Sequence, residues 1–234
     1  MDEVFSFQAE ARYLYKSTRS YFGEFSPPMF ITRHSPASDV SLRDQLWILY
    51  NRAYLNTVEM TVTHEMLDRL EFDDQLLDAA NRVWVVWDDT NPIAMTLVAT
   101  DVRRTRWLSE HYFRTHFPEK FAKGQVHYVV WAVVDPGFVA RGASIFMARH
   151  AMTTEATEES LLVFDLPETN QPNAYGGAAE LMLRMARMVG EAELITLTTQ
   201  RYYALNFAPA SASKAHQTDD LEARSQDQVG SRQE

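Results

Sequence analysis

The segment with the clearest chemical potential connects an apolar run to a helix-like run. It reads Val-Asp-Pro-Gly-Phe-Val-Ala-Arg-Gly-Ala-Ser-Ile-Phe over residues 134–146. A strand that leads through a loop into a helix aims free backbone N–H groups and the positive end of the helix dipole at one point, which suits a phosphate. Ala140, Gly142, Ala143 and Ser144 are small enough to let a ligand approach the backbone. These residues predict an anion-binding turn, and a plain connector is the alternative.

Histidine and tyrosine side chains offer groups for proton transfer. His127 lies on the apolar run before the loop, and the pKa of imidazole is the nearest of any side chain to neutral pH, so His127 is a candidate base. A hydrogen-bonded structural histidine is the alternative. Tyr128 points to the opposite face of the same strand, so only one of the two can face a substrate. Tyr203 and its neighbour Tyr202 could donate a proton, or pack as strand aromatics.

Two histidine patterns bear on metal binding. His64 and Asp68 frame a His-Glu-x-x-Asp sequence, but a zinc-binding helix of this kind needs a second histidine where Asp68 stands. His111 and His116 are five residues apart, which is poor spacing for one helical face. The chain has no cysteine, which excludes thiolate metal sites, disulfides and a cysteine nucleophile. We therefore expect no metal site.

The elements that must position these side chains follow from periodicity, turn residues and caps. The predicted series is strand 29–33, helix 41–55 capped by Ser41, a helix from Thr63 to 77 interrupted by a loop near 71–74, hairpin strands 83–87 and 93–102, helix 107–121 with a break at Pro118 near its end, strand 126–134, helix 141–152, strand 161–166, helix 175–189, and one or two strands over 193–207. The unbroken apolar run 126–134 is typical of a central strand covered on both faces. The series predicts an α/β fold with a mixed central β-sheet flanked by helices.

Composition divides the chain into three parts. Residues 1–27 form an N-terminal extension, residues 28–207 form one domain, and residues 208–234 form a disordered tail. The tail is rich in Ser, Gln, Asp and Ala and has almost no large apolar side chains, so it cannot bury enough surface to fold. No secretory signal pattern and no apolar run of roughly 20 residues is visible. We expect a cytoplasmic protein without a membrane span.

Residues 134–146 resemble the acyl-CoA loop of the GCN5-related N-acetyltransferase (GNAT) superfamily, which commonly reads Val-Asp-Pro-x-Tyr-Arg-Gly-Lys-Gly-x-Gly before a helix. The residues in register are Val134, Asp135, Pro136, Phe138 in the aromatic place, Arg141 in the basic place, and Gly142. The departures are Val139 in the place of Arg or Gln, and Ala140 and Ser144 in the places of glycines. The order of elements over 28–207 resembles the same fold.

The resemblance implies a splayed pair of parallel strands, 126–134 and 161–166, with the pantetheine of acyl-CoA between them. The backbone groups of Val133 and Val134 would pair with pantetheine. The pyrophosphate would be held by the amides of Val139, Ala140, Arg141, Gly142, Ala143 and Ser144. Asn170 stands in the place of the family's Asn before the last helix. The family's proton-donating Tyr falls on Gly177, so Tyr175, two residues earlier, is the candidate acid.

The function that the resemblance implies is acyl-CoA-dependent N-acyltransfer, without a metal, to a small amine or an amino-acid-like acceptor. The acyl group would be acetyl or longer, and an acyl carrier protein is a second candidate donor. The alternative is a non-catalytic domain that binds acyl-CoA or a protein partner as a sensor or regulator. Val139, Ser144 and the displaced tyrosine favour this alternative.

Charge bears on the choice of partner. The chain has 22 Lys and Arg against 32 Asp and Glu, a net charge of −10, which is a poor match for nucleic acid. The segment 103–123 is locally basic, with six Lys and Arg against two Glu. This basic segment could meet the phosphates of coenzyme A or an acidic carrier protein, and a solvated surface is the alternative.

Overall fold

A computed structural model describes residues 29–54, 66–166, 177–199 and 204 of the chain. The chain divides into two units, Met1–Ile195 and Thr196–Glu234, and all of the described helices and strands belong to the first. The elements in chain order are β1 (Phe30–His34), α2 (Val40–Tyr54), α3 (Arg69–Leu77), β2 (Asn81–Asp88), β3 (Asn91–Ala99), the 3₁₀ helix η2 (Val102–Arg104), α4 (Glu110–His116), α5 (Pro118–Ala122), β4 (Val126–Val134), the 3₁₀ helix η3 (Pro136–Arg141), α6 (Ala143–Thr157), β5 (Leu161–Val163) and α7 (Ala178–Arg187).

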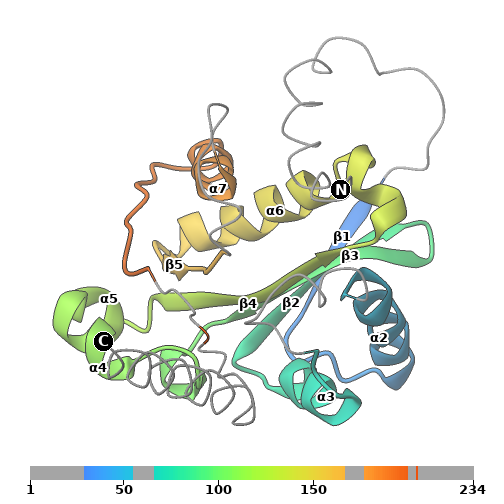
Figure 1. Cartoon of the computed structure of the whole chain (residues 1–234), viewed down its shortest axis with the longest axis horizontal. Coiled ribbons are helices and arrows are strands. Elements are labelled where there is room, and N and C mark those ends of the chain that lie inside the picture. The colour runs from blue at the N-terminus through green and yellow to red at the C-terminus, as the bar shows by residue number, and fades with distance from the viewer. Residues whose placement is uncertain (1–28, 55–65, 167–176, 200–203, 205–234) are drawn as a thin grey trace, which may run out of the picture. The chain divides into compact units, whose positions relative to one another are not determined.

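The five strands form one mixed sheet in the order β1-β2-β3-β4-β5. The first four strands pair antiparallel, and β5 pairs parallel with β4. Helices α2 and α3 cover one face, α6 covers the other, and α7 packs against α6 (Figure 1). The predicted α/β fold with a mixed central sheet flanked by helices is confirmed.

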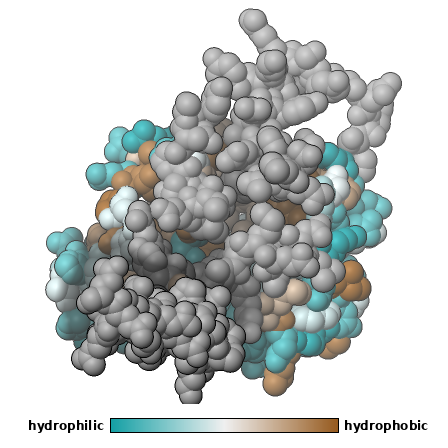
Figure 2. All heavy atoms as spheres, viewed as in Figure 1, coloured by the Kyte–Doolittle hydropathy of each residue, from teal (hydrophilic) through white to brown (hydrophobic). Residues whose placement is uncertain are grey.

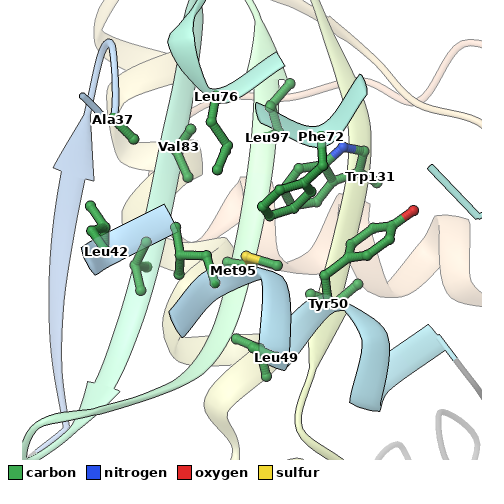
Figure 3. Packing of buried hydrophobic residues seen from close by; sticks show 13 residues of the cluster. Ala37, Leu42, Leu49, Tyr50, Phe72, Leu76, Val83, Met95, Leu97 and Trp131 are labelled. Atoms are coloured by element: carbon green, nitrogen blue, oxygen red, sulfur yellow. The ribbon is translucent and has the colours of Figure 1, made fainter. Parts of the chain in front are cut away.

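The larger core lies between the sheet and the layer of α2 and α3 (Figure 3). The Phe72 ring of α3 stacks on the Trp131 ring of β4 with centroids 5.9 Å apart, and the Tyr50 ring of α2 meets Trp131 edge-on at 5.8 Å. The indole N–H of Trp131 donates to Gln75 Oε1 at 2.8 Å, so its buried polar atom has a partner. This packing fixes β4 against both helices.

Strand β4 has a bulge at Val130. Leu97 of β3 lies opposite Trp131 and Val98 lies opposite Val129, so Val130 has no partner in β3. Val130 and Trp131 consequently both pack into the α2 and α3 core, whereas Val129 packs on the α6 side. A bulge bends a strand and increases its twist. In β4 the bulge separates residues 126–128, which pair with β5, from residues 131–134, which do not.

The start of α2 differs by one residue from the prediction, and its cap differs by two. The helix begins at Val40, and the Asp39 carboxylate accepts from the Leu42 N–H at 3.2 Å. The predicted cap, Ser41, therefore lies inside the first turn. An aspartate caps as well as a serine, so the two candidates could not be separated by residue type.

The prediction for α3 was wrong in its interior. The helix begins after Asp68, whose carboxylate accepts from the Glu71 N–H at 2.8 Å while the Glu71 carboxylate accepts from the Asp68 N–H at 3.3 Å. This reciprocal capping box satisfies two backbone donors, and residues 71–74 continue the helix instead of forming a loop. Thr63, the predicted cap, lies outside the described residues.

Several later elements differ in length from the prediction, and α6 is longer than predicted. The predicted break near Pro118 is confirmed, because the helical pattern is divided at Phe117 into α4 and α5, with Pro118 as the first residue of α5. Strand β5 ends at Val163. Residues 191–199 contain no strand, so the strand predicted from 193 is wrong over its described part.

Exposed apolar side chains are scattered over the described surface. Figure 2 shows hydrophobic and hydrophilic residues interspersed there. The large exposed ones include Ile48, Leu70, Trp107 and Met188, and single exposed apolar side chains are normal. No helix in the described ranges is long and apolar enough to cross a membrane.

Candidate functional site

The two parallel strands β4 and β5 separate soon after they meet. They pair only at Val126 with Leu161, His127 with Leu162 and Tyr128 with Val163. Strand β4 then runs on to Val134, whereas β5 has ended. From Val129 onward, the edge of β4 on the β5 side therefore has no strand partner among the described residues. We call this stretch the open edge.

Alternation along the ladder determines which backbone groups face the open edge. In an antiparallel pair, alternate residue pairs exchange both hydrogen bonds. The Asp135 N–H donates to the Ile93 carbonyl at 2.8 Å, in register with the pair Ala94 and Val134. The bonded pairs are thus those of odd-numbered β4 residues, so the peptide groups of Ala132 and Val134 face the open edge. Those of Val133 face Met95 of β3.

The loop that follows β4 is held by Asp135. Its carboxylate accepts from the Gly137 N–H at 2.9 Å and forms an ion pair with Arg52 at the end of α2, at 2.7 Å. The 3₁₀ helix η3 follows and ends at Gly142, whose φ of 76° lies in the left-handed region. Nothing lies within 4 Å of the place where a Cβ of Gly142 would be. The loop therefore leaves open space above a glycine backbone, as a cradle for a ligand requires.

Helix α6 starts at this glycine without a side-chain cap. The first bond within the helix runs from the Phe146 N–H to the Gly142 carbonyl at 3.0 Å. The N–H groups of the first turn, such as those of Ala143 and Ile145, have no acceptor within the helix, and the positive end of the helix dipole lies there. This geometry suits a phosphate group.

Arg141 is bound to the β2–β3 hairpin. Its guanidinium makes two hydrogen bonds to the Asp88 carboxylate, at 3.0 and 3.2 Å, and lies 4.7 Å from the centre of the Phe138 ring. Its charge is thus matched by Asp88. Any anion at this loop would be held mainly by backbone N–H groups.

The structure brings together the predicted binding residues Val134, Arg141, Gly142, Ala143 and Ser144 at one end of the open edge. The Val139 carbonyl accepts from the Gly142 N–H at 3.3 Å within the same loop. Asn170, Tyr175 and Tyr203 lie outside the described residues, and so does the side chain of Ala140.

His127 lies elsewhere, in a buried ion cluster between β4 and α6. It is 3% exposed, and its Nδ1 lies 2.5 Å from a carboxylate oxygen of Glu155. Glu155 also pairs with Arg82 at 3.2 Å and accepts from Ser160 at 2.7 Å, and Arg82 binds Glu158 at 2.7 Å. Both ring and carboxylate are thus enclosed, away from the loop. This placement favours the structural alternative for His127.

Tyr128, on the other face of β4, lies in a group that residue patterns did not reveal. Its hydroxyl donates to Asp165 Oδ1 at 2.7 Å, and its ring lies 6.3 Å from that of Trp107. Asp165 follows β5, and Tyr54, the last residue of α2, lies close enough for the charge of Asp165 to act on its hydroxyl. We call Tyr54, Tyr128, Asp165 and Trp107 the tyrosine–aspartate cluster. Tyr128 is the last β4 residue paired with β5, so the cluster stands where the open edge begins.

Burial is the largest cause that raises the pKa of Tyr128, followed by its hydrogen bond to Asp165 and the charge of that carboxylate. Burial also raises the pKa of Tyr54, with Tyr50 and Asp165 adding to the effect. Both phenols therefore stay neutral over the physiological range.

A cavity of about 350 Å³ opens beside the cluster. Leu97 and Val130 of the sheet form its apolar part, and Trp107 lines it as well as contacting Tyr128. Acidic residues of α3, Glu71 and Asp74, also line it. The cavity therefore adjoins the start of the open edge through Trp107.

The basic segment 103–123 does not reach the loop. Four of its arginines pair with acids: Arg103 with Asp101, Arg104 with Asp78, Arg106 with Glu71 and Arg114 with Glu110. The segment precedes the first residue of β4, whereas the loop follows the last residue of β4. The two ends of this nine-residue strand lie about 26 Å apart. Whether it meets coenzyme A phosphates stays a prediction, and these ion pairs favour the solvated surface. The carrier-protein alternative stays a prediction.

Comparisons with known proteins give structural likenesses only. No protein-family model and no curated protein sequence matches the chain. One similar solved structure is an aminoglycoside acetyltransferase from an uncultured soil metagenomic sample, in complex with trehalose (12% identity, TM-score 0.44, 76% of this chain and 97% of that chain). Another is a ribosomal-protein-alanine N-acetyltransferase from Brucella melitensis (13%, 0.41, 75% and 100%), and a third is an aminoglycoside 6'-N-acetyltransferase from Acinetobacter baumannii (14%, 0.41, 77% and 100%). At these identities and TM-scores the likenesses assign neither an activity nor an acceptor to this chain.

Proposed function

We propose that the chain is an acyl-CoA-dependent N-acyltransferase that moves an acetyl or longer acyl group from a thioester to a small amine. The observation that carries the proposal is the open edge of β4, which leads through η3 to the uncapped start of α6. A free strand edge offers hydrogen bonds to the amides of pantetheine, and the loop offers N–H groups to the pyrophosphate. The two features follow one another along the chain.

Each of the two features has an assigned role. The peptide groups of Ala132 and Val134 bind pantetheine, and the backbone from Val139 to Ser144 binds the pyrophosphate. From Val134 back to Val129 the strand measures about 17 Å, a length comparable with an extended pantetheine arm. The thioester then lies at the beginning of the open edge, next to Tyr128.

The reaction needs positioning and proton transfer rather than a covalent enzyme intermediate. The neutral amine attacks the carbonyl carbon of the thioester, so the C–N bond forms as the C–S bond breaks. The nitrogen gives a proton to water, and the departing thiolate takes one, leaving an amide and coenzyme A. Tyr175 and Tyr203 remain the predicted donors to the thiolate.

A non-catalytic acyl-CoA sensor is the second candidate. The ion pair between Arg141 and Asp88 favours it, because the side chain in the family's basic place is already neutralised. The two candidates differ in turnover: an enzyme releases free thiol from acetyl-CoA when an amine is present, and a sensor binds without release.

Calorimetric titration with acetyl-CoA and with a long-chain acyl-CoA tests the proposal in two matched variants. Gly142→Val puts a branched side chain into the open space at the loop. Gly124→Val places the same side chain at a comparable φ of 66°, also with nothing within 4 Å, before β4. Each substitution costs about 1 to 3 kcal/mol of backbone strain, so stability should fall equally.

We expect Gly124→Val to bind acyl-CoA like the unaltered protein and Gly142→Val to lose binding. Equal binding by both variants would contradict the assignment of the loop.

A further inference from the structure

Two ion pairs tie the loop between β4 and α6 to other parts of the sheet and its helices. Asp135, at the start of the loop, pairs with Arg52 of α2 at 2.7 Å. Arg141, at the end of η3, pairs with Asp88, the last residue of β2. Arg141 is the one basic residue between β4 and α6, and it directly precedes Gly142. The loop's own cation is therefore bound to the β2–β3 hairpin.

The pair of Arg141 and Asp88 is better oriented and better shielded than an ordinary surface ion pair. Nη1 of the guanidinium donates to one carboxylate oxygen at 3.0 Å, and Nη2 donates to the other at 3.2 Å. The side chain of Asp88 is 17% exposed and that of Arg141 is 35% exposed, with the Phe138 ring packed against the guanidinium. Two-point contacts of this kind are stronger than single ones, so removing Arg141 from Asp88 has a cost.

A phosphate at the start of α6 would need the same guanidinium. Guanidinium groups bind phosphates in the same two-point manner as carboxylates. The Cα atoms of Arg141 and Gly142 are consecutive, about 3.8 Å apart, and the open space above Gly142 lies at the uncapped helix start. The long side chain of Arg141 can therefore turn to an anion that the backbone N–H groups hold there.

We propose that Asp88 limits the affinity of the loop for phosphate-bearing ligands, because its carboxylate competes with their phosphates for Arg141. This inference rests on the proposed N-acyltransferase function and adds a determinant of donor affinity on the β2–β3 hairpin. With Asp88 charged, backbone N–H groups hold most of the bound phosphate. Without that charge, Arg141 turns to the phosphate and strengthens its binding.

A double-mutant cycle tests the inference. The four full-length proteins are the unaltered chain, Asp88→Asn, Arg141→Gln and the variant with both substitutions. Calorimetry measures the dissociation constants of two probes, acetyl-CoA and inorganic pyrophosphate, and circular dichroism checks that each variant is folded. We expect Asp88→Asn to bind at least about tenfold more tightly than the unaltered protein, since it frees a charged donor for the phosphate. In the Arg141→Gln background, the same substitution should tighten binding by less than about threefold.

Asp89→Asn is the matched control for the loss of one negative charge. It alters the next residue along, in the exposed β2–β3 turn, where asparagine tolerates the φ of 57°. Because Asp89 does not hold Arg141, this variant should bind both probes within about threefold of the unaltered protein. The gain in Asp88→Asn should shrink as salt is added, because salt screens the attraction between guanidinium and phosphate.

A smaller gain in Asp88→Asn, an equal gain in the Arg141→Gln background or in Asp89→Asn, or no binding of either probe by Asp88→Asn would overturn the inference. Failure of the proposed function alone would look different: acetyl-CoA would not bind, while the binding of pyrophosphate would still follow the cycle.

Discussion

At the scale of single residues, the ion cluster around Glu155 shows how a histidine in an apolar strand becomes structural. Burial alone would raise the pKa of Glu155, but the hydrogen bonds from His127 and Ser160, with the charges of His127 and Arg82, overcome that effect and hold the pKa below its usual value. The charged carboxylate is therefore part of the folded state. A residue in this position cannot also serve a substrate at the open edge.

Glu155→Gln should destabilise the fold by about 3 kcal/mol at neutral pH, because it leaves the buried polar partners of Glu155 without a charged carboxylate to bind. Since the folded pKa lies below the unfolded value of 4.5, the contribution of Glu155 is present above that pH and is lost as the pH falls through the folded pKa. Denaturant unfolding at pH 7 and near pH 4 measures both effects. Between pH 7 and pH 4, Glu155→Gln should lose less stability than the unaltered protein loses.

The matched control is Glu158→Gln, whose side chain is 37% exposed. It should cost about 1 kcal/mol or less. Equal losses for the two variants, or an unchanged pH dependence in Glu155→Gln, would show that the buried cluster does not stabilise the fold.

At the scale of elements, the open edge of β4 makes a prediction about proline. The N–H of Ala132 faces the open edge, so Ala132→Pro removes no bond to β3, whereas Val133→Pro removes the donor to Met95. Ala132→Pro should keep its fold by circular dichroism and lose about tenfold or more in acyl-CoA affinity. Val133→Pro should lose about 3 kcal/mol of stability. Undiminished affinity in a folded Ala132→Pro would contradict the assigned role of this edge.

The accuracy of the sequence-based elements followed the strength of their local signals. Strand β4 was predicted with its observed bounds, because eight of its nine residues are apolar or aromatic, which leaves little ambiguity. The capping box of Asp68 and Glu71 was visible as an Asp-x-x-Glu pattern, and it should have placed the start of α3. The bulge at Val130 depends on how β4 pairs with β3. The residues of β4 alone do not determine that register.

The site was only partly predictable for a similar reason. The loop could be found because its residues are contiguous. Strand alternation also predicted that His127 and Tyr128 lie on opposite faces of β4. In the structure, Tyr128 is the one that contacts Asp165 in the tyrosine–aspartate cluster. Asp165 lies 37 residues from Tyr128, and only the parallel pairing of β4 with β5 brings them together.

At the scale of the whole molecule, the layered arrangement explains why the open edge can exist. The packing of α2 and α3 holds β4 on one face and α6 holds it on the other, so the strand stays extended where β5 no longer pairs with it. Four arginines of the basic segment 103–123 pair with nearby Asp or Glu side chains. In a chain with a net charge of −10, this segment therefore forms no strongly positive surface. The proposed site for coenzyme A is thus formed by backbone groups more than by cations.

The central claim is that acyl-CoA lies along β4 and ends at the start of α6. Hydrogen–deuterium exchange of the full chain, with and without coenzyme A, tests it most directly, since bound amides exchange more slowly. The account predicts slower exchange in peptides that cover 129–134 and 142–147, and no change in α3, over 69–77. Slower exchange confined to 103–123, or none in the two predicted segments at saturating coenzyme A, would contradict it.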